Sequence, residues 1–148
     1  MWHIRRLDPG DTRAFRAMLA MMGEAFGEVD VYTEAQPSDA YVAGLLGSDS
    51  FIAFVAVEGD AVIGGITAYE LHKFEQERSE IYIYDLAVDE RHRRAGVATA
   101  LIEQLRAVAR DRGAYVIFVQ ADPPDAPAVA LYTKLGVRED VLHFDILP

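Results

Sequence analysis

Residues 93–98 of this sequence, Arg-Arg-Ala-Gly-Val-Ala, are of types that together could bind an anion. They follow a run of β-branched, aromatic and aliphatic residues at 80–88, which predicts a strand, and they lead into a helical pattern over 94–113. The first N–H groups of a helix have no intrahelical partners and carry partial positive charge. Small residues at Gly96 and Ala98 let an anion approach these donors, and the two arginines add full charges. The junction is therefore predicted to bind a pyrophosphate.

A motif this short is also typical of an ordinary solvated loop, in which the glycine forms a turn and the arginines face water. The context favours the anion site, because the motif follows a predicted strand and opens a predicted helix. That arrangement is the one that binding of a phosphate at a helix N-terminus requires.

The composition limits what such a site could serve. The chain has 148 residues, 51% of them hydrophobic, and no run of about 18 apolar residues, so we expect one domain, 1–148, with a core and no membrane span. It has no cysteine and no apolar leader, which predicts a cytoplasmic protein. The net charge of −10 argues against nucleic acid as a partner and suits a cationic ligand, although acidity is also typical of mere solubility.

Strand and helix patterns alternate along the chain, which predicts a mixed α/β sheet with helices on both faces. Gly27 is expected to end the first helix, Ser38 to cap the second, and the pair Gly64-Gly65 to mark a bulge or a close backbone approach. We expect strands at 2–7, 51–57, 61–71, 80–88, 115–120 (a buried one) and 137–146 (one strand or a pair), and helices at 12–26, 38–47, 94–113 and 125–135.

Two segments carry a resemblance to a known family. The triplet Leu86-Ala87-Val88, followed by Arg93-x-x-Gly96-x-Ala98, resembles the acetyl-CoA signature of the GCN5-related N-acetyltransferases, and residues 130–137 resemble the second signature of that superfamily. Longer blocks are similar to the type I aminoglycoside 3-N-acetyltransferases, the gentamicin-modifying group. These blocks are residues 24–32, 73–76, 79–88, 119–122 and 143–146.

The resemblance implies a mostly antiparallel mixed sheet in which two strands, at 80–88 and 115–121, splay apart in a V. Acetyl-CoA, the acetyl donor, would lie in this V, with its pantetheine arm along the first strand and its pyrophosphate at the junction described above. The residues that the family pattern assigns to the cofactor are Leu86, Ala87, Val88, Arg93, Arg94, Ala95, Gly96, Val97, Ala98, Thr99 and Tyr132.

The implied activity is transfer of an acetyl group to the 3-amino group of gentamicin-like aminoglycosides, directly within a ternary complex, which would confer resistance. An acetyltransferase for another polyamine or small amine is the alternative, and a CoA-binding module without catalysis is a third hypothesis. Tyr132 and the acidic strand argue against the module, because a pure binder needs neither. By family habit the chain would form a homodimer, and the four histidines show no spacing that indicates a metal site.

Acetyl transfer needs a neutral amine, so a base must remove a proton from the ammonium group of the acceptor. Asp85 is the first candidate and Glu80 the second. In a regular strand Asp85 would point away from Tyr82 and Tyr84, and a bulge would turn it towards them. Tyr84 occupies a position from which other family members present catalytic groups, and Tyr132 matches the tyrosine that protonates the departing thiolate.

Several acids and tyrosines could bind the ammonium groups of such a substrate through charge-assisted hydrogen bonds. The acidic segment that follows the first helix is by itself typical of a solvated loop, and the resemblance makes it the acceptor-binding loop. The residues expected to bind substrate are Glu28, Asp30, Tyr32, Tyr82, Asp85 and Asp145.

Overall fold

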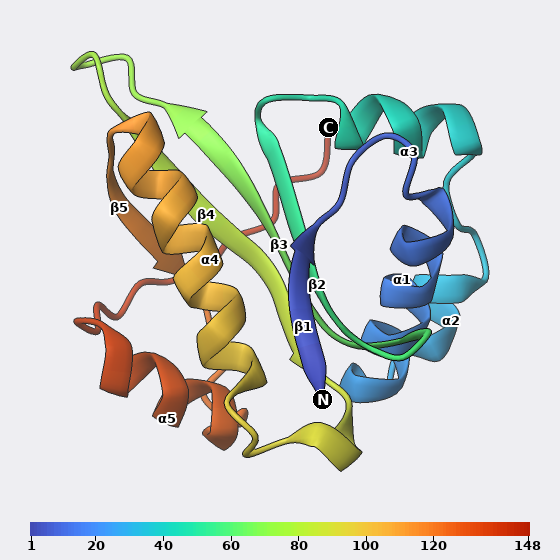
Figure 1. Ribbon diagram of the computed structural model, residues 1–148. Coiled ribbons are helices and arrows are strands. Elements are labelled where there is room, and N and C mark those ends of the chain that lie inside the picture. The colour runs from blue at the N-terminus through green and yellow to red at the C-terminus, as the bar shows by residue number, and fades with distance from the viewer.

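The computed structural model describes residues 1–148 as one five-stranded sheet with helices on both of its faces (Figure 1). The strands are β1 (Trp2–Arg6), β2 (Phe51–Glu58), β3 (Ala61–His72), β4 (Ser79–Val88) and β5 (Ala114–Val119). The helices are α1 (Thr12–Phe26), α2 (Val29–Thr33), α3 (Asp39–Leu46), α4 (Val97–Arg112) and α5 (Ala126–Leu135), with a single 3₁₀ turn, η1 (Glu90–His92).

The five strands lie side by side in sequence order, which confirms the predicted mixed and mostly antiparallel sheet. The pairs from β1 to β4 are antiparallel, and β5 pairs with β4 in parallel. A parallel neighbour needs a crossover connection, and α4 is that connection. The helix crosses one face of the sheet and so brings β5 to the outer edge beside β4 (Figure 1).

Helices pack on the two faces through separate apolar clusters. α1 and α3 cover one face with Met18, Met22 and Val42, and α4 covers the other with side chains such as Leu101 and Leu105. The predicted close approach at the glycine pair is confirmed. A Cβ atom on Gly64 would lie 2.8 Å from Val97 Cγ1, and one on Gly65 would lie 2.7 Å from Met18 Cγ. The two glycines therefore let a helix approach each face of β3.

Local signals end most of the helices where the sequence predicts. Gly27 takes the left-handed conformation (φ 67°) and ends α1, because glycine adopts positive φ without steric cost. The Ser38 side chain accepts a hydrogen bond from the Tyr41 amide and so caps α3. Asp125 caps α5 in the same way through the Ala128 amide.

Several elements differ from the sequence prediction. α4 starts at Val97 and not at residue 94, because Arg94 (φ 62°) and Gly96 (φ 80°) both take the left-handed conformation. The acidic segment after α1 contains the short helix α2 and is not a loop throughout. Tyr41 of α3 is 64% exposed, although the helical pattern at 38–47 predicts that it faces inward. β5 is half-exposed rather than buried, since it forms an edge of the sheet.

The final segment, residues 137–148, forms no strand, which contradicts the strand or strand pair predicted at 137–146. It runs extended from the end of α5 to the C-terminus (Figure 1). None of the described helices is both long and apolar enough to cross a membrane.

Candidate active site

The site begins where β4 and β5 part. The last pair between these strands joins Ile83 to Val119, where β5 ends. β4 continues to Val88 and is paired there only with β3, so its outer backbone edge from Tyr84 onward is open. Unpaired N–H and C=O groups along a strand edge can accept an extended ligand as an additional strand.

A bulge in β4 lies at the same point and sets the direction of Asp85. Tyr82 pairs with Tyr69 and Asp85 pairs with Thr67, so Tyr84 is the extra residue between the two pairs. Paired residues share a face of the sheet, and residues 67 and 69 of β3 lie on the same face. Asp85 therefore lies on the face of the tyrosines, as the sequence analysis anticipated for a bulged strand.

The carboxylate of Asp85 is half-buried and held by one strong hydrogen bond. The Tyr32 hydroxyl group donates to Asp85 Oδ2 over 2.8 Å, which joins α2 to β4. Burial raises the pKa of Asp85 above its ordinary value, and the nearby charge of Glu28 raises it further, while the hydrogen bond from Tyr32 opposes this shift. A carboxylate with a raised pKa is suited to accept a proton from an amine.

Tyr132 of α5 lies close enough to Asp85 for the charge of that carboxylate to raise its pKa. Burial, together with the charges of Asp125 and Asp85, raises the pKa of Tyr132 to about 12. Its hydroxyl group consequently stays protonated at neutral pH and can act as a proton donor. α5 and β4 thus present a donor and an acceptor of protons on the two sides of the splay.

Aromatic rings form a row from β3 across β4 to β5. The ring of Tyr84, which is 62% exposed, lies 5.8 Å from that of Tyr69 and 5.6 Å from that of Tyr82, and Tyr82 stacks on Phe118 at 4.7 Å. The Tyr82 hydroxyl group also donates to Gln120 Oε1 over 3.0 Å. Sequence reasoning missed Phe118 and Gln120. The alternation along β5 was the available signal, because Phe118 occupies the position beside Tyr82.

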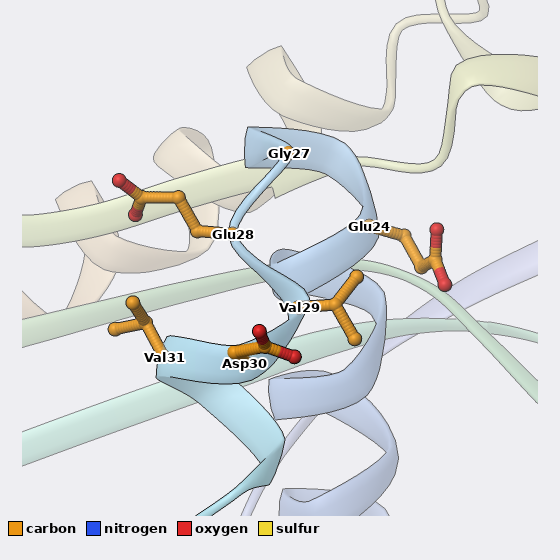
Figure 2. Close-up of a pocket in the computed structure, with 6 residues that line it drawn as sticks. All are labelled: Glu24, Gly27, Glu28, Val29, Asp30 and Val31. Atoms are coloured by element: carbon orange, nitrogen blue, oxygen red, sulfur yellow. The ribbon is translucent and has the colours of Figure 1, made fainter.

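The remaining predicted acids lie in different places. Glu28 and Asp30 line a pocket at the start of α2, where the carboxylates of Glu24 and Glu28 point to opposite sides (Figure 2). Glu80 lies at the other end of β4, where it contacts Lys73 and Tyr115 and not Asp85.

Asp145 is 88% exposed in the final segment, and its one bond is to His143. The structure thus brings Glu28, Tyr32, Tyr82 and Tyr84 together around Asp85, and it brings neither Glu80 nor Asp145 there.

The turn before α4 has the features that the sequence predicts for an anion site. Residues 93–96 are exposed, and no side chain caps the first amides of α4. Arg94 forms no ion pair, and the Arg93 side chain donates only to the Val88 carbonyl group, over 3.4 Å, so both charges are available. Arg91, in contrast, is engaged with Asp89 and lowers the pKa of that carboxyl group to about 2.

Other members of this predicted set differ in what they can offer a ligand. The side chains of Val97 and Ala87 are buried in the two apolar clusters, so only their backbone groups can face a ligand. The Thr99 side chain is exposed on the first turn of α4, Ala98 is half-buried, and Ala95 is exposed beside Gly96. Leu86 and Val88 lie on the open edge of β4.

The fold, the splayed strands and the open turn before α4 are together typical of an acetyltransferase. A family model described as the acetyltransferase (GNAT) family matches residues 16–137, and the chain belongs to that family.

Two solved structures are similar to this chain over nearly its whole length. An aminoglycoside acetyltransferase from an uncultured soil metagenomic sample is 56% identical, with a TM-score of 0.98 over 100% of this chain and 99% of that chain. A second one from such a sample, in complex with sisomicin, is 29% identical, with a TM-score of 0.91 over 99% of this chain and 96% of that one.

Curated relatives are more distant. N-acetyltransferase 8B of Rattus norvegicus is 29% identical over 91 residues, which make up 62% of this chain and 41% of that protein. The chain spans about half the length of the first curated relatives that it matches.

Proposed function

We propose that this chain transfers the acetyl group of acetyl-CoA to the 3-amino group of gentamicin-like aminoglycosides, acts as one domain in the cytoplasm, and confers resistance. The observation that carries the proposal is the environment of Asp85. It is a half-buried carboxylate with a raised pKa, placed at the open edge of β4 and surrounded by further acids and tyrosines. The similarity to aminoglycoside acetyltransferases over the whole chain supports the substrate class.

Acetyl-CoA fits the groups that the structure presents. The open edge of β4 from residue 84 to 88 can pair with the amide groups of a pantetheine arm. The uncapped amides at the start of α4 and the charges of Arg93 and Arg94 suit a pyrophosphate. A Cβ atom on Gly96 would find nothing within 4 Å, so the space in front of this turn is free.

The reaction needs one proton acceptor and one proton donor from the chain. When bound, acetyl-CoA supplies a thioester whose carbonyl carbon an amine can attack. Asp85 removes the proton from the acceptor ammonium group, and Tyr32 holds the Asp85 carboxylate in place during this step. Tyr132, protonated at neutral pH, would donate a proton to the departing sulfur atom and regain one from the nitrogen as the amide forms.

Acidic groups around Asp85 would bind the other charges of the substrate. Glu28 and Asp30 line the pocket at the start of α2, and the charge of Glu28 acts on Tyr32, so these two carboxylates can hold ammonium groups that do not react. The exposed ring of Tyr84 and its neighbour Tyr82 offer apolar faces for the sugar rings. Holding the rings at several points fixes the reacting nitrogen against the thioester.

The test is release of free CoA by the purified chain with gentamicin, sisomicin, spermidine or no acceptor, followed by NMR of the product. We expect turnover with the two aminoglycosides and an acetyl group on nitrogen 3. Turnover with spermidine alone would assign the enzyme to another amine, and no turnover with any amine would favour a CoA-binding module. An acetyl group on a different nitrogen would refute the 3-amino assignment only.

A matched pair of variants tests the base. Asp85→Asn keeps the size of the side chain and removes its basicity, so kcat/KM should fall by about 10²–10⁴-fold. Glu80→Gln should stay within a few-fold of the wild type, because Glu80 contacts Lys73 and Tyr115 rather than the cluster around Asp85. The reverse result would make Glu80 the base.

A further inference from the structure

The short helix α2, which carries Tyr32, is not held in place by burial alone. None of its five residues is buried, and Tyr32 is the only one that is not exposed. The link that follows, residues 35–37, makes no backbone hydrogen bond. A segment with so few buried contacts has low local stability. The hydrogen bond from Tyr32 to Asp85 therefore needs other groups to keep α2 in position.

Arg16 of α1 fixes the link between α2 and α3. Its Nη1 atom donates to Gln36 Oε1 over 3.1 Å, and its Nη2 atom donates to the Pro37 carbonyl group over 3.0 Å and to Asp39 Oδ1 over 2.6 Å. A guanidinium group presents several donors in a rigid plane, so it can hold three acceptors at once. One half-buried side chain thus ties three points of the link to α1.

Gln36 connects Arg16 to Tyr32. Its Nε2 atom donates to the Tyr32 carbonyl group over 3.2 Å, while its Oε1 atom accepts from Arg16. A side-chain amide has one donor end and one acceptor end, and only this orientation satisfies both neighbours. The backbone of Tyr32 is therefore tied to α1, while its hydroxyl group reaches Asp85 on β4.

Gly23 of α1 sets how closely Tyr32 can approach that helix, beside which α2 lies (Figure 1). A Cβ atom on Gly23 would lie 3.0 Å from Val29 Cα and 3.2 Å from Tyr32 Cβ. The Gly23 carbonyl group also accepts a hydrogen bond from the Glu28 amide over 2.8 Å. Glycine inside a helix costs stability, and here it provides the room that α2 needs.

We propose that Arg16, Gln36 and Gly23 are positioning residues, which hold Tyr32 where its hydroxyl group donates to Asp85. Gly23 contacts Tyr32 at its Cβ atom and Gln36 contacts it at its carbonyl group, so two separate points set the direction of the ring. The consequence for catalysis rests on the proposed function, in which Asp85 accepts the proton of the acceptor amine. A base that is held in one orientation needs no rearrangement before it reacts.

The first experiment measures the pKa of Asp85 in the free, full-length chain by NMR titration of its side-chain carboxyl carbon. The hydrogen bond from Tyr32 lowers this pKa, so Tyr32→Phe should raise it. We expect a smaller rise in Arg16→Met and Gln36→Met, because the bond then forms only part of the time. Gln36→Met changes no charge, so its effect cannot come from loss of the guanidinium group.

Matched controls separate this effect from a general loss of stability. Arg5→Met removes a comparable arginine bond, 2.8 Å long, to Asp11 at the start of α1, and it should leave the pKa of Asp85 unchanged. Gln36→Met added to Tyr32→Phe should cause no further rise, since the bond is already absent. An unchanged or lowered pKa in Gln36→Met alone, or an equal rise in the Tyr32→Phe background, would overturn the proposal.

Gly23→Ala tests the contact with α1 and leaves the hydrogen-bonding side chains intact. Its Cβ atom forces α2 to give by a few tenths of an ångström, so the pKa of Asp85 should rise here as well. Gly44→Ala in α3, whose Cβ atom meets nothing within 4 Å, should leave this pKa unchanged. No rise in Gly23→Ala would overturn its positioning role.

The second experiment measures acetyl transfer to gentamicin by Arg16→Met and Gln36→Met. We expect a several-fold fall in kcat/KM at about pH 5, a smaller fall at about pH 8, and an unchanged KM for acetyl-CoA. An equal fall at every pH would show an effect on stability alone and would count against the proposal. The NMR titration needs no substrate, so the expected pKa shifts without any turnover would refute only the proposed function.

Discussion

At the level of single residues, the proposed reaction depends on the charge of Asp85, which its neighbours control. Burial and the charge of Glu28 favour the protonated form of this carboxyl group, and the hydrogen bond from Tyr32 favours the ionised form. Only the ionised form can accept a proton from the substrate. Glu28 and Tyr32 therefore shift the pKa of Asp85 in opposite directions. Substituting each of them separately isolates its effect on this pKa.

The pH profile of kcat/KM should have an acid limb above the pH at which an ordinary aspartate titrates, about pH 4. Activity falls as the pH drops through the raised pKa, because Asp85 becomes protonated. Glu28→Gln removes a negative charge, lowers the pKa of Asp85 and moves the limb to lower pH. Tyr32→Phe removes the stabilising hydrogen bond, raises this pKa and moves the limb to higher pH.

Initial rates of CoA release between about pH 4 and 8, at constant ionic strength, give these limbs. The stability of each variant over the same range is the control for acid unfolding. If the acid limbs of both variants moved to higher pH, or both to lower pH, a group other than Asp85 would titrate in this limb.

At the level of elements, the turn before α4 combines an unusual backbone with a free anion surface. Gly96 has φ 80°, so any other residue there adopts the left-handed conformation at a cost of about 1 kcal/mol. Gly113 has φ 69° at the opposite end of the same helix, and neither glycine has an atom within 4 Å of an added Cβ. Gly113 therefore serves as a control for Gly96, because substitution of either residue strains the backbone but only Gly96 lies at the candidate anion site.

Gly96→Ala and Gly113→Ala should each lower the free energy of unfolding by about 1 kcal/mol, as measured by denaturant titration. Only Gly96→Ala should raise KM for acetyl-CoA, several-fold, because it disturbs the amides that we propose bind the pyrophosphate. An equal rise in KM for both variants would show that the effect comes from the stability of α4 and not from the turn.

Packing of α4 against β3 gives a second test at this level. Gly64→Ala places its Cβ atom 2.8 Å from the stiff side chain of Val97, and we expect a loss of about 1–3 kcal/mol in unfolding free energy. Gly44→Ala, within α3 and with nothing inside 4 Å, should instead gain up to about 1 kcal/mol from helix propensity. A stable Gly64→Ala variant would mean that α4 can move away from the sheet.

The sequence predicts elements well where the deciding signal is local. Gly27 and Ser38 end and begin helices by their own conformation or side chain, and the strand pattern of β4 is visible in its residue types. The first turn of α4 could not be predicted, because nothing in the type of Arg94 indicates a positive φ. The exposure of β5 depends on which strands pair beside it, and no local pattern contains that information.

In the candidate site, too, local signals could be predicted and features that depend on strand pairing could not. The candidate cofactor-binding residues at the turn and on β4 are predicted by motif, since the expected pyrophosphate and pantetheine arm set their spacing. The direction of Asp85 depends on the bulge at Tyr84, and the contacts of Phe118 and Gln120 depend on the register between β4 and β5. Register is set by the whole sheet, so these parts of the site required the structure.

At the level of the whole molecule, the net charge of −10 has the sign that suits the polycationic substrate proposed for this chain. A field of this sign concentrates cationic ligands near the protein, and salt screens it over about 10 Å at 0.1 M. KM for gentamicin should therefore rise several-fold between about 50 and 500 mM NaCl, with a smaller change in kcat. A steady-state titration at each salt concentration, with acetyl-CoA saturating, measures this effect. A KM independent of salt would confine recognition to short contacts inside the site.

The bulge in β4 means that one residue of the strand is not needed for pairing. Ile83 and Asp85 both keep their partners on β3 whether or not Tyr84 stands between them. Deletion of Tyr84 would leave the hydrogen bonds between β3 and β4 complete. It would remove one aromatic ring and the bulge beside Asp85. Natural variation in chain length at this point would thus change the surface beside Asp85, at little expense to the stability of the sheet.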